Sequence, residues 1–361
     1  MDASAQERQP GGGAGLERVM SLVTRRNARA QVCVMHRGRL VLDRAVGCEP
    51  DSLFLIYSAS KPFVALAVHL LAQRGALGLD DPVSAYWPAY ARHGKEEITI
   101  RHVLAHRAGV PVAGSLLRTI RSMPDWDRSV RDAERARPRY PPGQVPAYHF
   151  ITYGFILGAL VERVAGTPFR EFLAENLLAP AGLDDVHIGL PDEQWPRHVP
   201  VRAAHPGELI NQRVFNRRAV RQAVIPAAGI STTARHLARF YQMLLDGGQA
   251  DGVRVLEPAT IAEARRPTSD GQVDVFIKRP VRWAQGFQLG GPGADPRDMS
   301  RLLGTRSSPQ AFGHAGNASC IAWADPGREL VLAYLSNLQE GLDAGIRHIG
   351  AVSDAVLAAC R

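Results

Sequence analysis

The chain of 361 residues is long enough to bury a large core, and its 45% hydrophobic and 22% charged residues are ordinary for a soluble globular protein. Its 43 basic residues give a net charge of +8, but they are almost all scattered arginines without runs of like charge, so they do not indicate a nucleic-acid partner. No apolar run is long enough to span a bilayer, which excludes a membrane-spanning helix.

The amino terminus is polar and rich in glycine. Residues 1–14 lack the basic start, apolar middle and small-residue cleavage site of a signal peptide, so we expect a disordered tail and a cytoplasmic protein. The four cysteines are far apart and have no C-x-x-C spacing, which favours free buried thiols. A bridge between Cys33 and Cys48 stays open.

The first ordered elements are predicted to be a helix and two strands. Apolar residues at helical spacing indicate a helix over Leu16–Val23, and strands follow at Ala30–Met35 and Leu40–Ala45, joined by a tight turn. Phe54–Tyr57 then leads to an apolar run at residues 63–72, which predicts a helix buried on all sides. Strands before such a helix indicate that it packs on a sheet.

Ser58 and Lys61 stand at the start of this buried helix. Their spacing of three places both side chains on one helix face. A serine needs a neighbour that takes its proton, and a lysine can do so only when burial or another cation lowers its pKa from about 10.4. The chain has only three lysines, so this pairing rarely arises from composition alone. An N-capping serine beside a snorkelling lysine is the structural alternative.

The middle of the chain is predicted to be helical and rich in loops. Helices are expected at Asp125–Arg137, Phe155–Val164, Pro168–Leu178 and Ala234–Leu245, and loops at residues 190–225. His102 and His106 could place two metal ligands on one helix face. No acidic partner of the H-E-x-x-H kind accompanies them and no third ligand is evident, so we expect no metal site.

The last third of the chain returns to strands and closes with a helix. Strands are expected at Arg282–Leu289, Ala311–Gly313, Ser319–Ala324 and Leu330–Ser336, and the helix at Ala344–Ala359. Strands at both ends with helices between them predict an α/β (α+β) fold, in which an antiparallel sheet is flanked by helices and an all-helical lobe is inserted. We expect residues 15–75 and 280–361 to form the sheet domain and residues 76–279 the mostly helical domain.

Two further motifs complete a pattern with Ser58-x-x-Lys61. Tyr148-His149 follows a Pro-Gly turn and precedes an apolar helix, and His314-Ala315-Gly316-Asn317 lies on a strand edge. In this order the motifs resemble those of the serine β-lactamase and penicillin-binding-protein superfamily, most closely its class C-like branch of serine esterases and transesterases. The similar stretches extend from about Arg37 to Asn337.

The resemblance implies a β-lactamase/transpeptidase-like fold and catalysis through an acyl-enzyme. Ser58 would attack an acyl carbonyl, and Lys61 and Tyr148 would hold and move its proton. Tyr148 could act as a base only as a phenolate stabilised by a nearby cation such as Lys61. The backbone amides of Ser58 and Asn317 would form the oxyanion hole.

Four residues are candidates for substrate binding: His149, His314, Gly316 and Trp283. His149 could equally make a structural hydrogen bond at a helix start, and His314 could be a half-buried polar residue on its strand. Trp283 and Phe287 lie on one face of the predicted strand and could wall an acyl pocket, although core packing is the stronger interpretation.

The chain departs from the family pattern at two positions. Phe150 stands where the Y-x-N motif has an asparagine that contacts the substrate amide, and His314 replaces the lysine of K-T-G. A histidine is mostly neutral at pH 7, so it anchors a substrate carboxylate less well than a lysine does. Both changes favour an ester over a carboxylated lactam.

These observations favour a serine hydrolase, and within that class a carboxylesterase acting on small or medium acyl esters. We expect a small-molecule acyl substrate, no cofactor, and neither a nucleic-acid nor a membrane partner; the sequence does not predict the oligomeric state. The alternatives on the same site are an acyltransferase or transesterase, and a β-lactamase or D-amino-acid peptidase. A non-catalytic relative would keep the fold as a binding module, but the presence of Ser58, Lys61 and Tyr148 argues against it.

Overall fold

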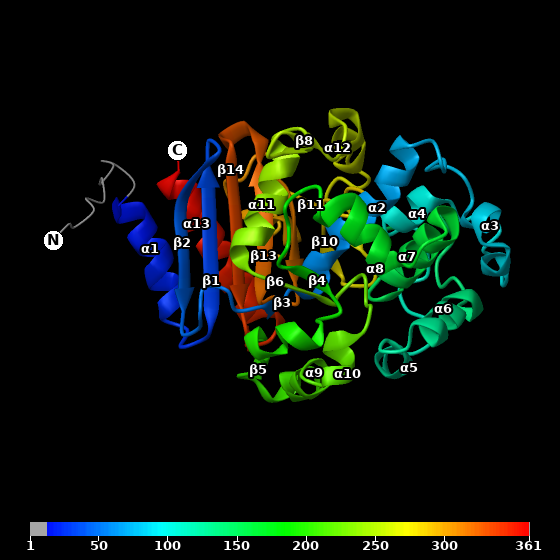
Figure 1. Cartoon of the computed structure of the whole chain (residues 1–361), viewed down its shortest axis with the longest axis horizontal. Coiled ribbons are helices and arrows are strands. Elements are labelled where there is room, and N and C mark those ends of the chain that lie inside the picture. The colour runs from blue at the N-terminus through cyan, green and yellow to red at the C-terminus, as the bar shows by residue number, and fades with distance from the viewer. Residues whose placement is uncertain (1–12, 361) are drawn as a thin grey trace.

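A six-stranded antiparallel sheet organises the computed structural model, which describes residues 13–360 (Figure 1). The strand order is β11-β12-β13-β14-β1-β2. The strands are β1 (Ala30–His36), β2 (Arg39–Val46), β11 (Gln288–Leu289), β12 (Phe312–Gly316), β13 (Cys320–Asp325) and β14 (Leu330–Ser336). Because β1 pairs with β14, the hairpin from the start of the chain joins the strands from its end. The predicted fold class is therefore confirmed.

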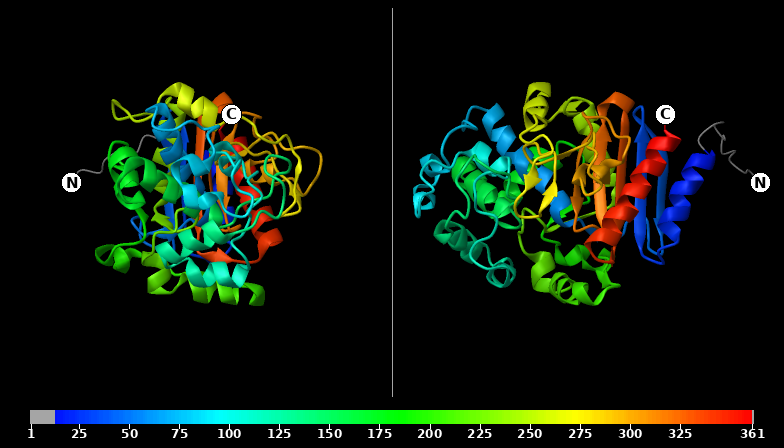
Figure 2. Two further views of the ribbon diagram at one scale, coloured as in Figure 1. Left: turned by 90° about the vertical axis from the view of Figure 1, so that its right-hand side faces the viewer. Right: turned by 180° about the vertical axis from the view of Figure 1, so that it is seen from behind.

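Helices cover both faces of the sheet (Figures 1 and 2). They are α11 (Ala234–Leu245) on one face, and α1 (Gly13–Thr24) and α13 (Leu342–Ala359) on the other. Side chains of β14 alternate between them: Leu332 and Tyr334 belong to the core under α1 and α13, while Val331 and Ala333 belong to the core under α11. Both faces are buried, which explains why the central strands are mostly apolar on both sides.

The second part of the molecule is largely helical and adjoins the β11 edge of the sheet (Figure 1). Its α-helices are α2 (Lys61–Gln73), α3 (Val83–Tyr86), α4 (Ile100–Leu104), α5 (Leu116–Ser122), α6 (Trp126–Arg135), α7 (Thr152–Ala165), α8 (Phe169–Leu173), α9 (Leu209–Phe215), α10 (Arg218–Gln222) and α12 (Pro258–Ala264). Helix α2 packs against α7 and is buried from Lys61 to Leu71, as its apolar sequence predicts. It links the sheet to the helical part.

Short strands form four further small sheets among the described residues. These are β3 (Phe54–Leu55) and β4 (Val186–Ile188) on either side of β6 (Ile230–Thr232), β5 (Arg202–Ala203) with β15 (Leu338–Gln339), β7 (Gln249–Ala250) with β8 (Val253–Arg254), and β9 (Val273–Asp274) with β10 (Arg279–Pro280). The β3–β6 pairing fixes the segment that leads into Ser58.

Three expected elements differ from the structure. The segment Arg282–Leu289 is not one strand, because the chain reverses at Gly286 (φ +96°) and Trp283 bridges back to Gln288. Residues 190–225 contain α9 and α10 rather than loops alone. Helix α11 lies in the segment expected to form the helical domain, yet it packs on β1, β13 and β14, because its buried apolar residues need the cover that the sheet provides.

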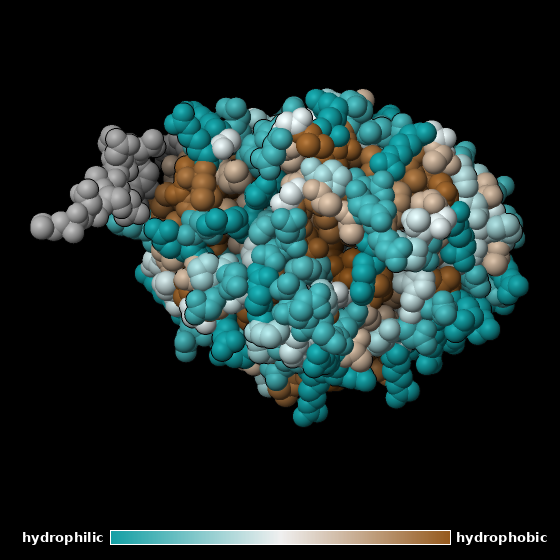
Figure 3. Space-filling view, viewed as in Figure 1, coloured by the Kyte–Doolittle hydropathy of each residue, from teal (hydrophilic) through white to brown (hydrophobic). Residues whose placement is uncertain are grey.

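The amino terminus, the cysteines and the surface can be compared directly with the expectations from the sequence. Of the expected disordered tail, residues 1–12 lie outside the described residues, and α1 begins at Gly13. Cys33 and Cys48 do not form a bridge, and all four thiols are free. Hydrophilic residues cover most of the face seen in Figure 3. From residue 13 to residue 360 no helix combines the length and apolar character that crossing a membrane requires.

Candidate active site

Ser58 lies in a tight turn just before α2 rather than in the helix itself. The turn is a 3₁₀-helix spanning Tyr57–Ser60, and α2 begins at Lys61. Tyr57 has a φ of +47°, a left-handed conformation that is strained for a bulky side chain. Ser58 is partly exposed, whereas the residues on either side of it are buried. The turn therefore presents the Ser58 hydroxyl at the surface of a cavity.

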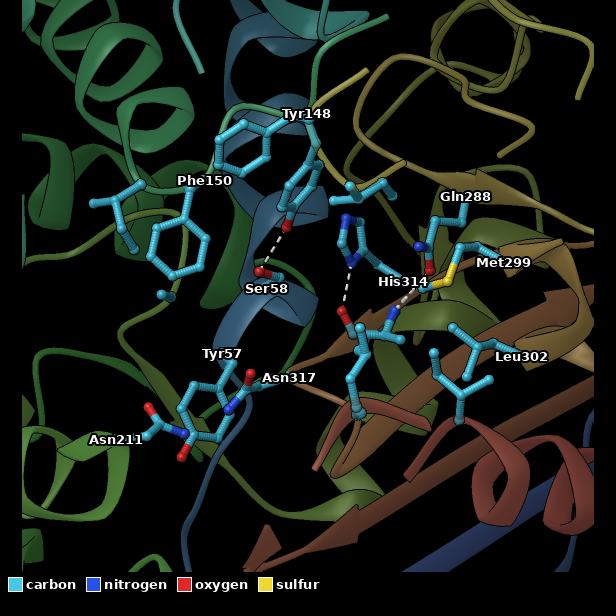
Figure 4. A pocket seen from close by; sticks show the side chains of 18 of the residues that line it. Tyr57, Ser58, Tyr148, Phe150, Asn211, Gln288, Met299, Leu302, His314 and Asn317 are labelled. Carbon is cyan, nitrogen blue, oxygen red and sulfur yellow. Dashed lines mark hydrogen bonds between the residues drawn. The ribbon is translucent and has the colours of Figure 1, made fainter. Parts of the chain in front are cut away.

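The side chains of Lys61 and Tyr148 both reach the Ser58 hydroxyl. The Tyr148 hydroxyl donates a hydrogen bond of 2.7 Å to Ser58 Oγ (Figure 4), and Lys61 Nζ lies 3.2 Å from the same oxygen. Lys61 Nζ also lies 2.8 Å from the carbonyl oxygen of Phe150 and 3.4 Å from that of Ala227. The structure thus brings together the three residues predicted to be catalytic.

Burial shifts the pKa values of the lysine and the tyrosine in opposite directions. Lys61 is completely buried, and desolvation lowers its pKa well below 10.5. Desolvation likewise raises the pKa of Tyr148 above 10, although its hydrogen bond to Ser58 opposes this shift. Within residues 13–360 no carboxylate forms an ion pair with Lys61. These shifts favour the neutral amine of Lys61 and the neutral phenol of Tyr148 over the ammonium and the phenolate.

Two backbone amides beside the hydroxyl are available to a ligand. Asn317 lies in the turn between β12 and β13 with a φ of +44°, and both Asn317 and Ser58 line the cavity. Neither amide donates a hydrogen bond to any acceptor among the described residues. This arrangement agrees with the oxyanion hole expected from the sequence, which stays a prediction.

Gly316 sets the distance between β12 and the Ser58 turn. A Cβ atom at this position would lie 2.0 Å from the carbonyl oxygen of Ile56, closer than any real contact. Gly316 does not line the cavity, so the structure does not support its expected contact with substrate. Instead, its missing side chain allows β12 to pack closely against Ile56. The thiol of Cys320 donates to the same Ile56 oxygen at 3.2 Å, which fixes the approach from the neighbouring strand.

Replacing Gly316 with alanine should displace β12 from the Ser58 turn and lower kcat about tenfold or more, because misplacing an oxyanion-hole donor costs transition-state stabilisation. The measurement is kcat for p-nitrophenyl acetate together with the thermal midpoint. Gly293→Ala is the matched control, since its added carbon meets its nearest atom, an Asp298 carboxylate oxygen, at an ordinary 3.4 Å. An unchanged kcat in Gly316→Ala would show that the spacing is not needed for catalysis.

A cavity of about 270 Å³ adjoins Ser58. Asn211, Tyr57 and Asn317 lie to one side of the serine, and His314, Gln288, Met299 and Leu302 lie to the other (Figure 4). The remaining lining is apolar: Phe150, Ile151, Phe215, Ala228, Phe276, Ile277, Trp283, Ala315, Ala318, Leu342 and Ile346, with Tyr148 beside them. No lysine, arginine or carboxylate is among the described residues that line it.

The two predicted histidines occupy different places. His314 lines the cavity, with Nδ1 2.7 Å from the Ala315 carbonyl oxygen, and burial lowers its pKa to about 3, so the ring is neutral. His149 does not line the cavity: its Nε2 accepts a hydrogen bond of 3.2 Å from the Val110 amide. The expected substrate contact of His149 is therefore wrong, because the backbone turns its ring into the core behind Tyr148.

The other histidine pair serves the local fold. His106 Nδ1 accepts a hydrogen bond of 3.2 Å from the His149 amide, and His102 Nδ1 accepts one of 3.3 Å from the Thr99 amide in a helix-capping arrangement. Each ring thus bonds to a different backbone segment.

Trp283 contacts both the tyrosine and the cavity. Its ring stacks on that of Tyr148, with centroids 5.4 Å apart and an interplanar angle of 8°. It is buried and also lines the cavity, the weaker of the two interpretations of the sequence, while its contact with substrate stays a prediction. Its indole N–H donates to the carboxylate of Asp274, a residue that the sequence analysis did not single out. A lone acidic residue within the apolar stretch Val273–Ile277 was the available signal. Gln288, Met299 and the other distant lining residues carried none.

Comparisons with known proteins agree with this geometry. The profile of the family described as Beta-lactamase matches residues 19–357. Esterase/beta-lactamase LipL of Mycobacterium tuberculosis (strain ATCC 25618 / H37Rv) is 29% identical over 82% of this chain and 72% of its own. A crystal structure of a family VIII carboxylesterase is 26% identical with a TM-score of 0.81, over 96% of this chain and 99% of that one. A penicillin-binding protein homologue from Caulobacter crescentus is 26% identical with a TM-score of 0.82, over 98% of this chain and all (100%) of that one.

The fold, the serine at the cavity and these similarities define the protein as a serine hydrolase. More narrowly, the chain belongs to the Beta-lactamase family. The resemblance noted in the sequence is thereby confirmed.

Proposed function

We propose that the protein is a carboxylesterase that cleaves small or medium acyl esters through an acyl-enzyme on Ser58. The observation that carries this proposal is the cavity beside Ser58, whose described lining is apolar or uncharged. A β-lactam or a peptide ending in a D-amino acid carries a carboxylate, and burying a carboxylate without a cation is costly. An ester of a neutral alcohol has no such charge. The name of LipL and the similarity to a family VIII carboxylesterase support the same substrate class.

The contacts of Lys61 explain how Ser58 would be activated. A neutral amine has two N–H groups and one lone pair. The carbonyl oxygens of Phe150 and Ala227 accept N–H groups at 2.8 and 3.4 Å, and in the neutral amine the lone pair would then face the Ser58 hydroxyl 3.2 Å away. Lys61 thus takes the proton as Ser58 Oγ bonds to the acyl carbon, and the carbonyl electrons move to its oxygen. Each amide at that oxygen contributes about 3 kcal/mol to stabilising the transition state.

Tyr148 supplies the proton for the leaving group. When the tetrahedral intermediate collapses, the bond to the alcohol oxygen breaks and the Tyr148 hydroxyl protonates that oxygen. The Lys61 ammonium lies 4.6 Å from the centre of the tyrosine ring, where it stabilises the transient phenolate and then returns the proton to it. Water enters the acyl-enzyme by the same steps in reverse and releases the acid.

A panel of chromogenic substrates tests the proposal. We expect kcat/KM for p-nitrophenyl butyrate to exceed that for the cephalosporin nitrocefin by about a hundredfold or more, corresponding to ~2.7 kcal/mol in the transition state. The Ser58→Ala variant serves as the blank for both substrates. Equal or faster nitrocefin turnover would contradict the ester assignment, and a butyryl product formed with added butanol would identify transfer in place of hydrolysis.

A further inference from the structure

A buried carboxylate, Asp274, lies behind the tyrosine in the short strand β9. Its Oδ1 accepts hydrogen bonds from the backbone amides of Tyr148 at 3.1 Å, Phe276 at 3.0 Å and Ile277 at 3.1 Å. Its Oδ2 accepts one from the indole Nε1 of Trp283 at 3.1 Å. Asp274 is completely buried, and within residues 13–360 it has no ion pair with a lysine or arginine. Four donors from three segments thus converge on one side chain.

The four donors all belong to the site. Tyr148 donates to Ser58 Oγ, and Trp283 stacks on the Tyr148 ring. Trp283, Phe276 and Ile277 line the cavity. A second contact secures the same loop, because the Val275 amide donates at 3.0 Å to the carbonyl oxygen of Pro146, two residues before Tyr148. Asp274 therefore joins the phenol to one wall of the cavity.

A carboxylate suits this place better than any other side chain. It accepts at both oxygens and donates nothing, so it satisfies three amides and an indole without a clash. Burial raises the pKa of Asp274 above its usual value, and the four donors oppose this shift because they favour the charged form. An asparagine could keep the three amide bonds through its oxygen, but its NH₂ group would then face the indole N–H.

We propose that Asp274 is a positioning residue that fixes the Tyr148 backbone and the Trp283 ring together, so that the phenol stays on Ser58 while substrate fills the cavity. The inference rests on the proposed role of Tyr148 as the proton donor. A displacement of about 1 Å in a catalytic group can cost a hundredfold in rate. The loop carrying Phe276 and Ile277 moves with the same anchor, so KM should respond as well as kcat.

A double-mutant cycle between Asp274 and Trp283 tests this proposal. Asp274→Asn should lower kcat for p-nitrophenyl butyrate tenfold or more, per serine labelled by a fluorophosphonate, and should raise KM. In the Trp283→Phe background, which keeps a ring on Tyr148 but has no indole N–H, the same Asp274→Asn change should cost threefold or less. The loss should be smaller in this background because the asparagine NH₂ group no longer faces an indole N–H.

Asp325→Asn is the matched control. Asp325 is also fully buried, and it accepts hydrogen bonds from the Ser308 amide at 2.9 Å, the Ser308 hydroxyl at 2.6 Å and the Gly327 amide at 3.1 Å. Unlike the residues that Asp274 contacts, it lies at the end of β13 and does not line the cavity. It should lower the thermal midpoint and leave kcat per labelled serine unchanged. A merely structural role for Asp274 would give that same result.

A kcat for Asp274→Asn within twofold of wild type, or equal losses in both backgrounds, would overturn the positioning role. If Asp274→Asn does not fold, Trp283→Phe alone tests the proposal, because it removes one of the four donors to Asp274. A threefold loss of kcat in this variant would support the positioning role, and an unchanged kcat would overturn it. These outcomes leave the proposed function standing, because that function fails only if wild-type enzyme does not cleave the ester or does so without Ser58.

Discussion

Ser58→Ala is expected to lower kcat for p-nitrophenyl butyrate by about 10⁴-fold or more and to abolish labelling by a fluorophosphonate. The hydroxyl accepts a hydrogen bond from Tyr148 at 2.7 Å, faces Lys61 Nζ at 3.2 Å and lines the cavity. Removing one oxygen leaves the lysine and tyrosine without a nucleophile to activate. Steady-state kinetics and the mass of the labelled protein give the two measurements.

Ser60→Ala provides the control for this experiment. Ser60 is two residues away, but it is buried, and its Oγ accepts a hydrogen bond of 3.3 Å from the Ile230 amide. Its loss should reduce stability by about 1 kcal/mol and leave labelling intact. Wild-type turnover in Ser58→Ala, or loss of labelling in Ser60→Ala with the fold retained, would contradict the assignment of the nucleophile.

The strands could be predicted where burial alone determines the pattern of apolar residues along the chain. Strands β1, β13 and β14 have both faces covered, so their apolar sequences identify them without knowledge of their partners. The segment Arg282–Leu289 was misread because it carries strand-forming residues, while the decisive feature is the left-handed Gly286, which reverses the chain. Whether one glycine turns a strand depends on what packs around it, and a single sequence does not contain that information.

The sequence predicts which site residues lie close together only where those residues are also close along the chain. Ser58 and Lys61 are three residues apart on one turn, so their proximity follows from the backbone alone. Tyr148 and His149 are neighbours in sequence, but Tyr148 bonds to Ser58 whereas His149 accepts a hydrogen bond from the Val110 amide, and this difference depends on tertiary contacts. Asp274 reaches the site mainly through bonds to backbone amides, so its lone charge within Val273–Ile277 indicates a special position but not which residues it contacts.

Burial connects the proposed chemistry with the proposed choice of substrate. The burial that lowers the pKa of Lys61 also lowers that of His314, to about 3. The described lining of the cavity offers no fixed cation for an anionic substrate. Under the proposed function, activation of the serine and preference for an uncharged ester would therefore have one physical cause.

Lys61→Arg is expected to lower kcat by about 10³-fold or more, because a guanidinium does not deprotonate and cannot accept the Ser58 proton. The change keeps a long basic side chain, so it separates the loss of a base from the loss of packing. Lys278→Arg is the matched control, since Lys278 is exposed and does not line the cavity. That variant should retain wild-type kcat.

The pH profile shows whether the neutral amine is the active form. Because burial lowers the pKa of Lys61 well below 10.5, kcat/KM of the wild type should rise with pH through this lowered value and reach a plateau, as the ammonium gives up its proton. At higher pH it should fall again as Tyr148, whose pKa is raised above 10, loses the proton that the leaving group needs. The residual activity of Lys61→Arg should lack the ascending limb. An ascending limb that persists in this variant with the same midpoint would assign the titrating base to another group.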